Sequence, residues 1–130
     1  MLRRIVIVCT VLSLSGCGLL GSKPTAMDVC KKLEASKVAS GCREDKPMGV
    51  GAAAVEKAAF DLPSVPGKGG QVLRFDKAET YRTTVETFEK TAFLAGPHRY
   101  GNEGKLIFVQ FNDGASLEVG KQTKTIVEGL

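Results

Sequence analysis

The sequence has no tryptophan and a single histidine, His98, among its 130 residues. With only two tyrosines and six phenylalanines, the core must be built mainly from aliphatic side chains. General acid–base chemistry near neutral pH would depend on His98 or on a carboxylate. A structural zinc site would have too few good ligands. We therefore expect no bound metal and no cofactor.

Blocks of like charge are also missing, although the formal net charge is +4. Arg3 and Arg4 account for half of this charge. Residues 17–130 alone carry 16 basic and 14 acidic side chains. Nucleic-acid binding usually needs a basic patch or stripe. We therefore expect no nucleic-acid partner.

No apolar run is long enough to span a bilayer. The longest, residues 5–14, is interrupted by Thr10 and Ser13 and follows the basic Arg3-Arg4 pair. A run of ten residues suits the central region of a signal peptide and is too short for a transmembrane helix. The small residues Ser15 and Gly16 follow it, immediately before Cys17.

The tetrapeptide Leu14-Ser15-Gly16-Cys17 resembles the lipobox of bacterial lipoproteins. This resemblance implies that residues 1–16 are removed, that Cys17 is lipidated, and that the general secretory route is used. Residues 17–25 would then form a tether, and a membrane would be a partner through the lipid. The protein would lie in the cell envelope. Because Gly18 rather than Asp follows Cys17, a host with two membranes would place it in the outer membrane, facing the periplasm.

Four cysteines are present, and processing would leave two for pairing. Cys9 would leave with the signal peptide and Cys17 would be acylated, so we expect a disulfide between Cys30 and Cys42 in an oxidising compartment. Closing a loop of about 13 residues stabilises a fold by roughly 3 kcal/mol. The alternatives are metal ligation and two free thiols.

The first element after the tether is predicted to be a helix over residues 26–36, preceded by a capping box at Thr25 and Asp28. It should end near Ser36, so that Val38 folds back over Leu33 and Cys42 returns to Cys30. Residues 43–51 are predicted to be a loop. Apolar residues then alternate along a first strand over residues 58–62.

A second strand is predicted over residues 71–75 and a third over residues 106–111, which is apolar on both faces. Between them, a helix begins at Ala78 and reaches Thr91 or Ala92; its apolar stripe is Ala78, Tyr81, Val85, Phe88 and Ala92. These three elements predict a parallel βαβ unit. A last helix covers residues 119–130, with Gly120 allowing close packing.

The predicted fold is a single small α+β domain over residues 26–130. Its mixed β-sheet has about three strands, in the order α-β-β-α-β-α, packed with helices and joined by one disulfide. Residues 98–104 are predicted to form an exposed loop. Within it, His98, Arg99 and Tyr100 are a candidate ligand loop for an anionic group; the alternative is an ordered loop in which Tyr100 covers the sheet edge.

The function predicted first is that of a non-enzymatic envelope lipoprotein that binds or scaffolds a protein partner in the envelope. No catalytic residue is assigned. The alternative is a small hydrolase-like envelope enzyme, or an anionic-ligand binder, with its site around His98.

Overall fold

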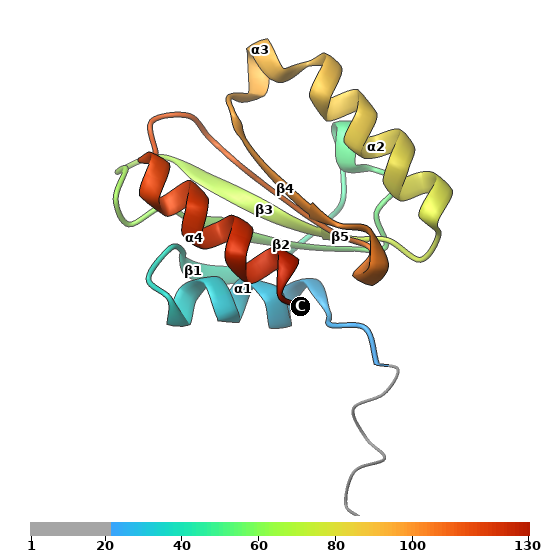
Figure 1. The fold of residues 1–130 in the computed structure, drawn as a ribbon, viewed down its shortest axis with the longest axis horizontal. Helices are drawn as coiled ribbons and strands as arrows, with labels where there is room; N and C mark the ends of the chain where they lie inside the picture. The colour runs from blue at the N-terminus through green and yellow to red at the C-terminus, as the bar shows by residue number, and fades with distance from the viewer. Residues whose placement is uncertain (1–21) are drawn as a thin grey trace, which may run out of the picture.

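The computed structural model describes residues 22–130, so the predicted signal peptide and the lipidation site at Cys17 lie outside the described residues. The described chain alternates helices and strands in an α+β fold, as predicted (Figure 1). The elements are α1 (Ala26–Ala35), β1 (Ser40–Asp45), η1 (Gly49–Gly51), β2 (Glu56–Asp61), β3 (Gly69–Arg74), α2 (Ala78–Lys90), α3 (Ala92–Ala95), β4 (His98–Asn102), η2 (Glu103–Lys105), β5 (Ile107–Phe111) and α4 (Leu117–Glu128).

The sheet has five strands in the order β1-β2-β3-β5-β4, and every neighbouring pair is antiparallel. The predictions of about three strands, a mixed sheet and a parallel βαβ unit are therefore wrong. The chain leaves α2 through α3 and first runs along the edge as β4. It then turns at η2 and returns as β5, so that β5 meets β3 in the opposite direction.

The two strands that sequence reasoning missed, β1 and β4, are the edge strands. The predicted loop over residues 43–51 contains the second half of β1, and the predicted exposed loop over residues 98–104 contains β4. Both strands carry mostly polar residues, since an edge strand buries little of its surface. Neither shows the apolar alternation that identified β2 and β3, or the continuous apolar run that identified β5.

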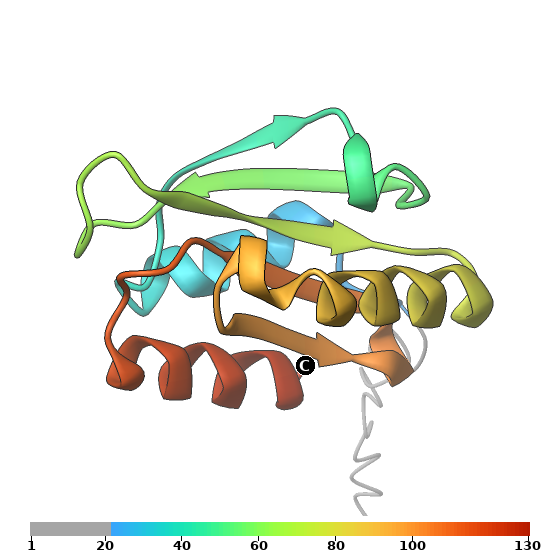
Figure 2. The same ribbon diagram turned by 90° about the horizontal axis from the view of Figure 1, so that it is seen from above.

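Helices cover both faces of the sheet, with α1 and α4 on one face and α2 on the other (Figures 1 and 2). β5 lies inside the sheet and is buried along its whole length. Its side chains alternate: Ile107, Val109 and Phe111 pack with α1 and α4, while Phe108 packs with α2. This confirms the prediction that the strand is apolar on both faces.

The predicted capping box and disulfide are both present at α1. The hydroxyl of Thr25 accepts from the backbone N–H of Asp28 (3.0 Å), and the Asp28 carboxylate accepts from the backbone N–H of Thr25 (2.9 Å). The helix ends where predicted, because Lys37 adopts φ 62° and turns the chain back. Cys42 then returns to Cys30 at a Cα–Cα distance of 6.0 Å, and the two are bonded.

Candidate functional site

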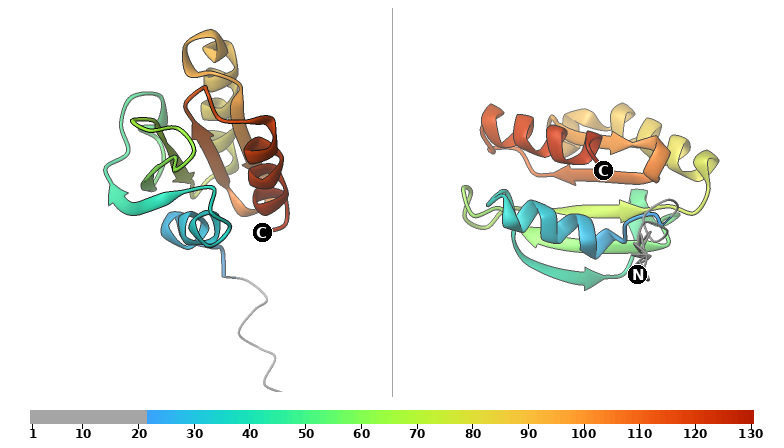
Figure 3. Two further views of the ribbon diagram at one scale, coloured as in Figure 1. Left: turned by 90° about the vertical axis from the view of Figure 1, so that its left-hand side faces the viewer. Right: turned by 60° about the horizontal axis from the view of Figure 1, so that its bottom comes forward.

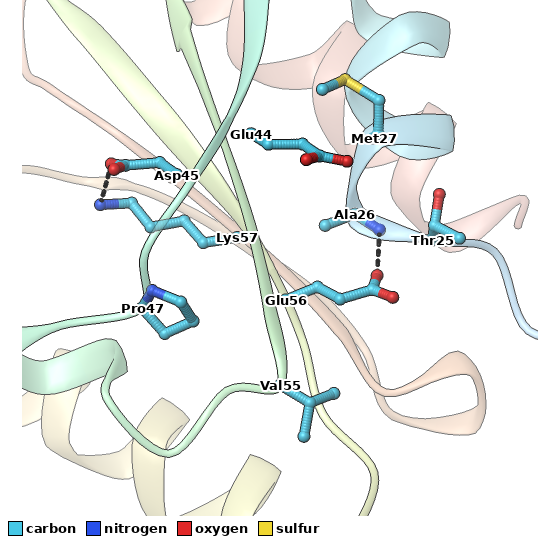
Figure 4. A pocket seen from close by; sticks show the side chains of 9 residues that line it. All are labelled: Thr25, Ala26, Met27, Glu44, Asp45, Pro47, Val55, Glu56 and Lys57. Atoms are coloured by element: carbon cyan, nitrogen blue, oxygen red, sulfur yellow. Dashed lines mark hydrogen bonds and ion pairs between the residues drawn. The ribbon is translucent and has the colours of Figure 1, made fainter.

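A hollow of about 320 Å³ lies between the start of α1 and strands β1 and β2 (Figure 4). Three of its lining residues are carboxylates, one is a lysine, and Met27, Pro47 and Val55 supply an apolar wall. The full lining is Thr25, Ala26, Met27, Glu44, Asp45, Pro47, Val55, Glu56 and Lys57.

Glu56, on β2, connects the sheet to α1. One carboxylate oxygen accepts from the backbone N–H of Ala26 in the first turn of α1 (2.9 Å), and the other accepts from Arg74 (2.7 Å). These bonds, that of Arg74 above all, hold the pKa of Glu56 below its usual value. The positive end of the helix dipole also favours an anion here. Glu56 is therefore a structural carboxylate that fixes the start of α1.

The other two carboxylates of the hollow differ from each other. Asp45 forms an ion pair with Lys57 (2.7 Å), and this bond is the main reason that the pKa of Asp45 is lowered. Glu44 points towards α1 and Met27 (Figure 4) and makes no ion pair or hydrogen bond with the described residues. The hollow thus offers one unengaged carboxylate beside an apolar wall. That arrangement can accommodate a cationic group.

His98, predicted to lie on an exposed loop, is a buried residue of β4 with only 4% of its surface exposed. Its ring stacks on Phe111, with the ring centres 4.5 Å apart and the planes 14° from parallel. Nε2 lies 3.1 Å from the carbonyl oxygen of Ala115, and Nδ1 lies 3.2 Å from the hydroxyl of Tyr100. Because a carbonyl oxygen only accepts, Nε2–H is the donor to Ala115, and Nδ1 shares a hydrogen bond with the hydroxyl of Tyr100. Both ring nitrogens are therefore engaged inside the fold.

Gly120 of α4 lies directly above this pair, as the predicted close packing requires. A Cβ atom at Gly120 would come within 3.2 Å of Nδ1 of His98 and closer still to the hydroxyl of Tyr100. Tyr100 is half-buried on the edge strand, and burial raises the pKa of its hydroxyl. Tyr100 therefore belongs to the edge strand itself and packs on the sheet face under α4, with its hydroxyl bonded to His98.

Arg99 lies on the opposite face of the sheet from His98 and Tyr100, because successive side chains of a strand point to opposite sides. Its guanidinium donates to the carbonyl oxygen of Phe88 near the end of α2 (2.7 Å). The structure therefore brings His98 and Tyr100 together under α4 and separates Arg99 from them. A composite cationic and aromatic loop at residues 98–100 is not formed.

Sequence reasoning missed an exposed apolar pair on α3, which we call the α3 tip: Phe93 and Leu94. These side chains are 83% and 76% exposed. The signal was available, because Phe93 and Leu94 lie outside the apolar stripe predicted for the preceding helix and are followed after one residue by the helix-ending pair Gly96-Pro97. The α3 tip and the start of the described chain, Ser22, lie at opposite ends of the molecule (Figures 1 and 3).

Within residues 22–130, no group of three or more His, Cys, Asp or Glu side chains could hold a metal ion. In the same part of the chain, none of the helices has the length and apolar character needed to cross a bilayer. A comparison with known proteins finds no family model, no curated protein and no solved structure that matches the chain. The function is therefore inferred from the residues and geometry described above.

Proposed function

We propose that the protein is an exported bacterial lipoprotein, anchored through Cys17, whose domain is a non-catalytic module that binds a protein partner through the α3 tip. The leader and the sequence Leu14-Ser15-Gly16-Cys17 support the anchor. The bond between Cys30 and Cys42 supports an oxidising compartment. In a host with two membranes, the protein would reside in the outer membrane and face the periplasm.

The observation that carries the binding role is the exposure of Phe93 and Leu94. Burying a Phe or Leu side chain contributes about 1.5–3 kcal/mol of favourable free energy. A partner that covers Phe93 and Leu94 would therefore gain this contribution from each side chain. Gly96, at φ 76°, and Pro97 end the helix immediately afterwards. The α3 tip therefore projects from the end of the molecule that is remote from the tether.

The charges beside the α3 tip favour a protein with an apolar pocket over a lipid surface. The nearest charged residues of α2 are Glu86, Glu89 and Lys90, and Lys90 is paired with Glu86 (2.7 Å). Glu89 is balanced by Arg99, whose guanidinium lies at the carbonyl oxygen of Phe88 near the end of α2. The charges beside the tip therefore sum to zero and supply no cationic attraction to an anionic membrane. An apolar pocket with a neutral rim complements the tip better.

The anchor is tested by metabolic labelling with palmitate. Label should enter the wild-type protein and not the Cys17→Ser variant, because the thiol of Cys17 is the acceptor of the lipid. Equal labelling of the two proteins would overturn the anchor. Separation of the two membranes tests the location independently, and recovery with the inner membrane would overturn only that part.

The binding role is tested by placing a photo-crosslinking residue at position 93 in cells. Leu117 is the matched control position, since it is 81% exposed and belongs to a different element, α4. We expect one discrete adduct from position 93, none from position 117, and loss of the adduct when Leu94→Asp is added. Equal adducts from both positions, or an adduct that survives Leu94→Asp, would contradict the proposal. Crosslinking to lipid instead of protein would also contradict it.

The alternative of an enzyme or anionic-ligand site around His98 gains no support from the geometry. Both nitrogens of His98 are engaged, and Arg99 faces the other side of the sheet.

A further inference from the structure

A second hollow, of about 620 Å³, lies beside the first described residues of the chain, and we call it the lysine hollow. Its lysines come from two elements that are distant in sequence, α1 and η2. Its lining is Ser22, Pro24, Asp28, Lys31, Lys32, Ala35, Lys105 and Leu130. A fourth lysine, Lys23, lies between two of the lining residues in the sequence.

The lysines of this hollow are poorly neutralised. Lys32 and Lys105 make no ion pair with any residue in the described part of the chain. Lys31 is 3.4 Å from Glu34 and stays 59% exposed, which is a weak pair in water. The carboxylate of Asp28 accepts from the backbone N–H of Thr25 and interacts with Lys32 only through a weaker coulombic attraction, without an ion pair. The ammonium groups are therefore available to an anionic partner.

The positive charge of the domain is concentrated here. The lysine hollow and Lys23 together carry four lysines and one aspartate. The rest of residues 22–130 carries 12 basic and 13 acidic side chains. One side of the domain is thus distinctly cationic, and the remainder is close to neutral.

The length of the tether brings this side close to a membrane. Only five peptide units separate Cys17 from Ser22, which can span at most about 18 Å. Electrostatic attraction extends over about 8–10 Å at physiological ionic strength. If Cys17 is anchored, Ser22 and the adjoining lysine hollow cannot move far from the lipid headgroups.

We propose that the lysine hollow docks on the anionic phospholipid headgroups of the membrane that holds the anchor. This inference rests on the proposed anchoring through Cys17. Each lysine near an anionic surface favours binding about fivefold, so the net charge of +2 within the hollow favours the docked orientation about 25-fold. Docking in this way directs the α3 tip, at the other end of the molecule, away from the membrane (Figure 1).

The test uses the acylated protein reconstituted in vesicles of phosphatidylcholine alone, or of phosphatidylcholine mixed with phosphatidylglycerol. A water-soluble amine-acetylating reagent is applied, and mass spectrometry measures the modification of each lysine. We expect acetylation of Lys31, Lys32 and Lys105 to be at least about fivefold slower on the anionic vesicles, and high salt to remove the difference. Lys90 on α2 is the internal control, since it is 73% exposed and lies far from the hollow. Equal acetylation on both vesicles would overturn the proposal.

A pair of variants with equal charge change separates local docking from general attraction. Lys32→Glu with Lys105→Glu should abolish the protection of Lys31 on anionic vesicles. Lys77→Glu with Lys90→Glu, at the two ends of α2, should leave that protection nearly unchanged. Equal loss in the two variants would show that net charge alone is responsible and would overturn a specific docking surface.

The outcomes also separate this inference from the proposed function. A wild-type protein that stays in the supernatant with both vesicles would overturn the anchor and the docking together. A protein that is bound to both vesicles, with equally reactive lysines, would overturn the docking alone.

Discussion

Replacing His98 with alanine should destabilise the domain severely, contrary to what an exposed loop residue would do. The ring of His98 fills the space between Phe111 and α4. It also donates a hydrogen bond to the carbonyl oxygen of Ala115 and shares one with the hydroxyl of Tyr100. The substitution removes the packing and both bonds at once.

The expected cost is about 3 kcal/mol in the free energy of unfolding. Truncating a large buried side chain and leaving a partly collapsed cavity costs about 2 kcal/mol or more. Losing the bond to Ala115, whose carbonyl oxygen then faces the cavity, adds about 1 kcal/mol. The hydroxyl of Tyr100 can turn to water, because Tyr100 is only half-buried, so its loss adds little.

Urea unfolding of the mature protein, followed by circular dichroism, measures this cost. A loss of about 3 kcal/mol corresponds to a melting temperature lower by roughly 10–20 °C for a domain of this size. Tyr100→Phe is the matched control, since it removes one bond to His98 and keeps the ring; we expect it to cost about 1 kcal/mol or less. A loss below about 0.5 kcal/mol for His98→Ala, which is typical of surface residues, would refute the buried position of His98. Because the expected loss is large, any phenotype of His98→Ala must first be compared with the amount of folded protein.

Two further predictions concern the attachment of α1. Replacing Cys30 and Cys42 with alanine should lower the free energy of unfolding by about 3 kcal/mol, because the bond closes a loop in the unfolded chain; an unchanged urea midpoint would contradict this. Arg74 and the amide of Ala26 hold the pKa of Glu56 below its ordinary value of 4.5. The ionised carboxylate therefore contributes stability that is complete above that value and is lost as the pH falls through the lower, folded-state pKa. As the pH is lowered, the free energy of unfolding should accordingly fall less steeply in Glu56→Gln than in the wild type. Identical pH profiles for the two proteins would refute the role of Glu56.

Much of the fold could be predicted because local signals and burial agree in its central elements. The capping residues Thr25 and Asp28 mark the start of α1, because the hydrogen bonds between them lie within one helical turn. The strands β3 and β5 bury their apolar residues, so the pattern of those residues is visible in the sequence. The position of Cys42 predicted the end of α1, because a longer helix would have carried the chain too far from Cys30.

The direction of β5 could not be predicted in the same way. A strand, a helix and another strand favour a parallel crossover only when the second strand follows the helix directly. Here the additional strand β4 intervenes, and its sequence, His98-Arg99-Tyr100-Gly101-Asn102, contains no apolar residue that alternates with polar ones. Its pairing with β5 depends on backbone hydrogen bonds, which leave no pattern of side chains in the sequence.

The same strand explains why the candidate site was mistaken. In a loop, three consecutive polar and aromatic side chains can converge on one ligand. In a strand they point alternately to opposite faces, so His98 and Tyr100 meet α4 while Arg99 meets the end of α2. Each then finds a partner inside the fold, and the three contribute to packing two different helices on the sheet. Two of the surfaces left without such partners, the α3 tip and the lysine hollow, lie at opposite ends of the molecule. That separation is what a tethered binding module requires, because a domain held to a membrane by one end can meet its partner only with the other.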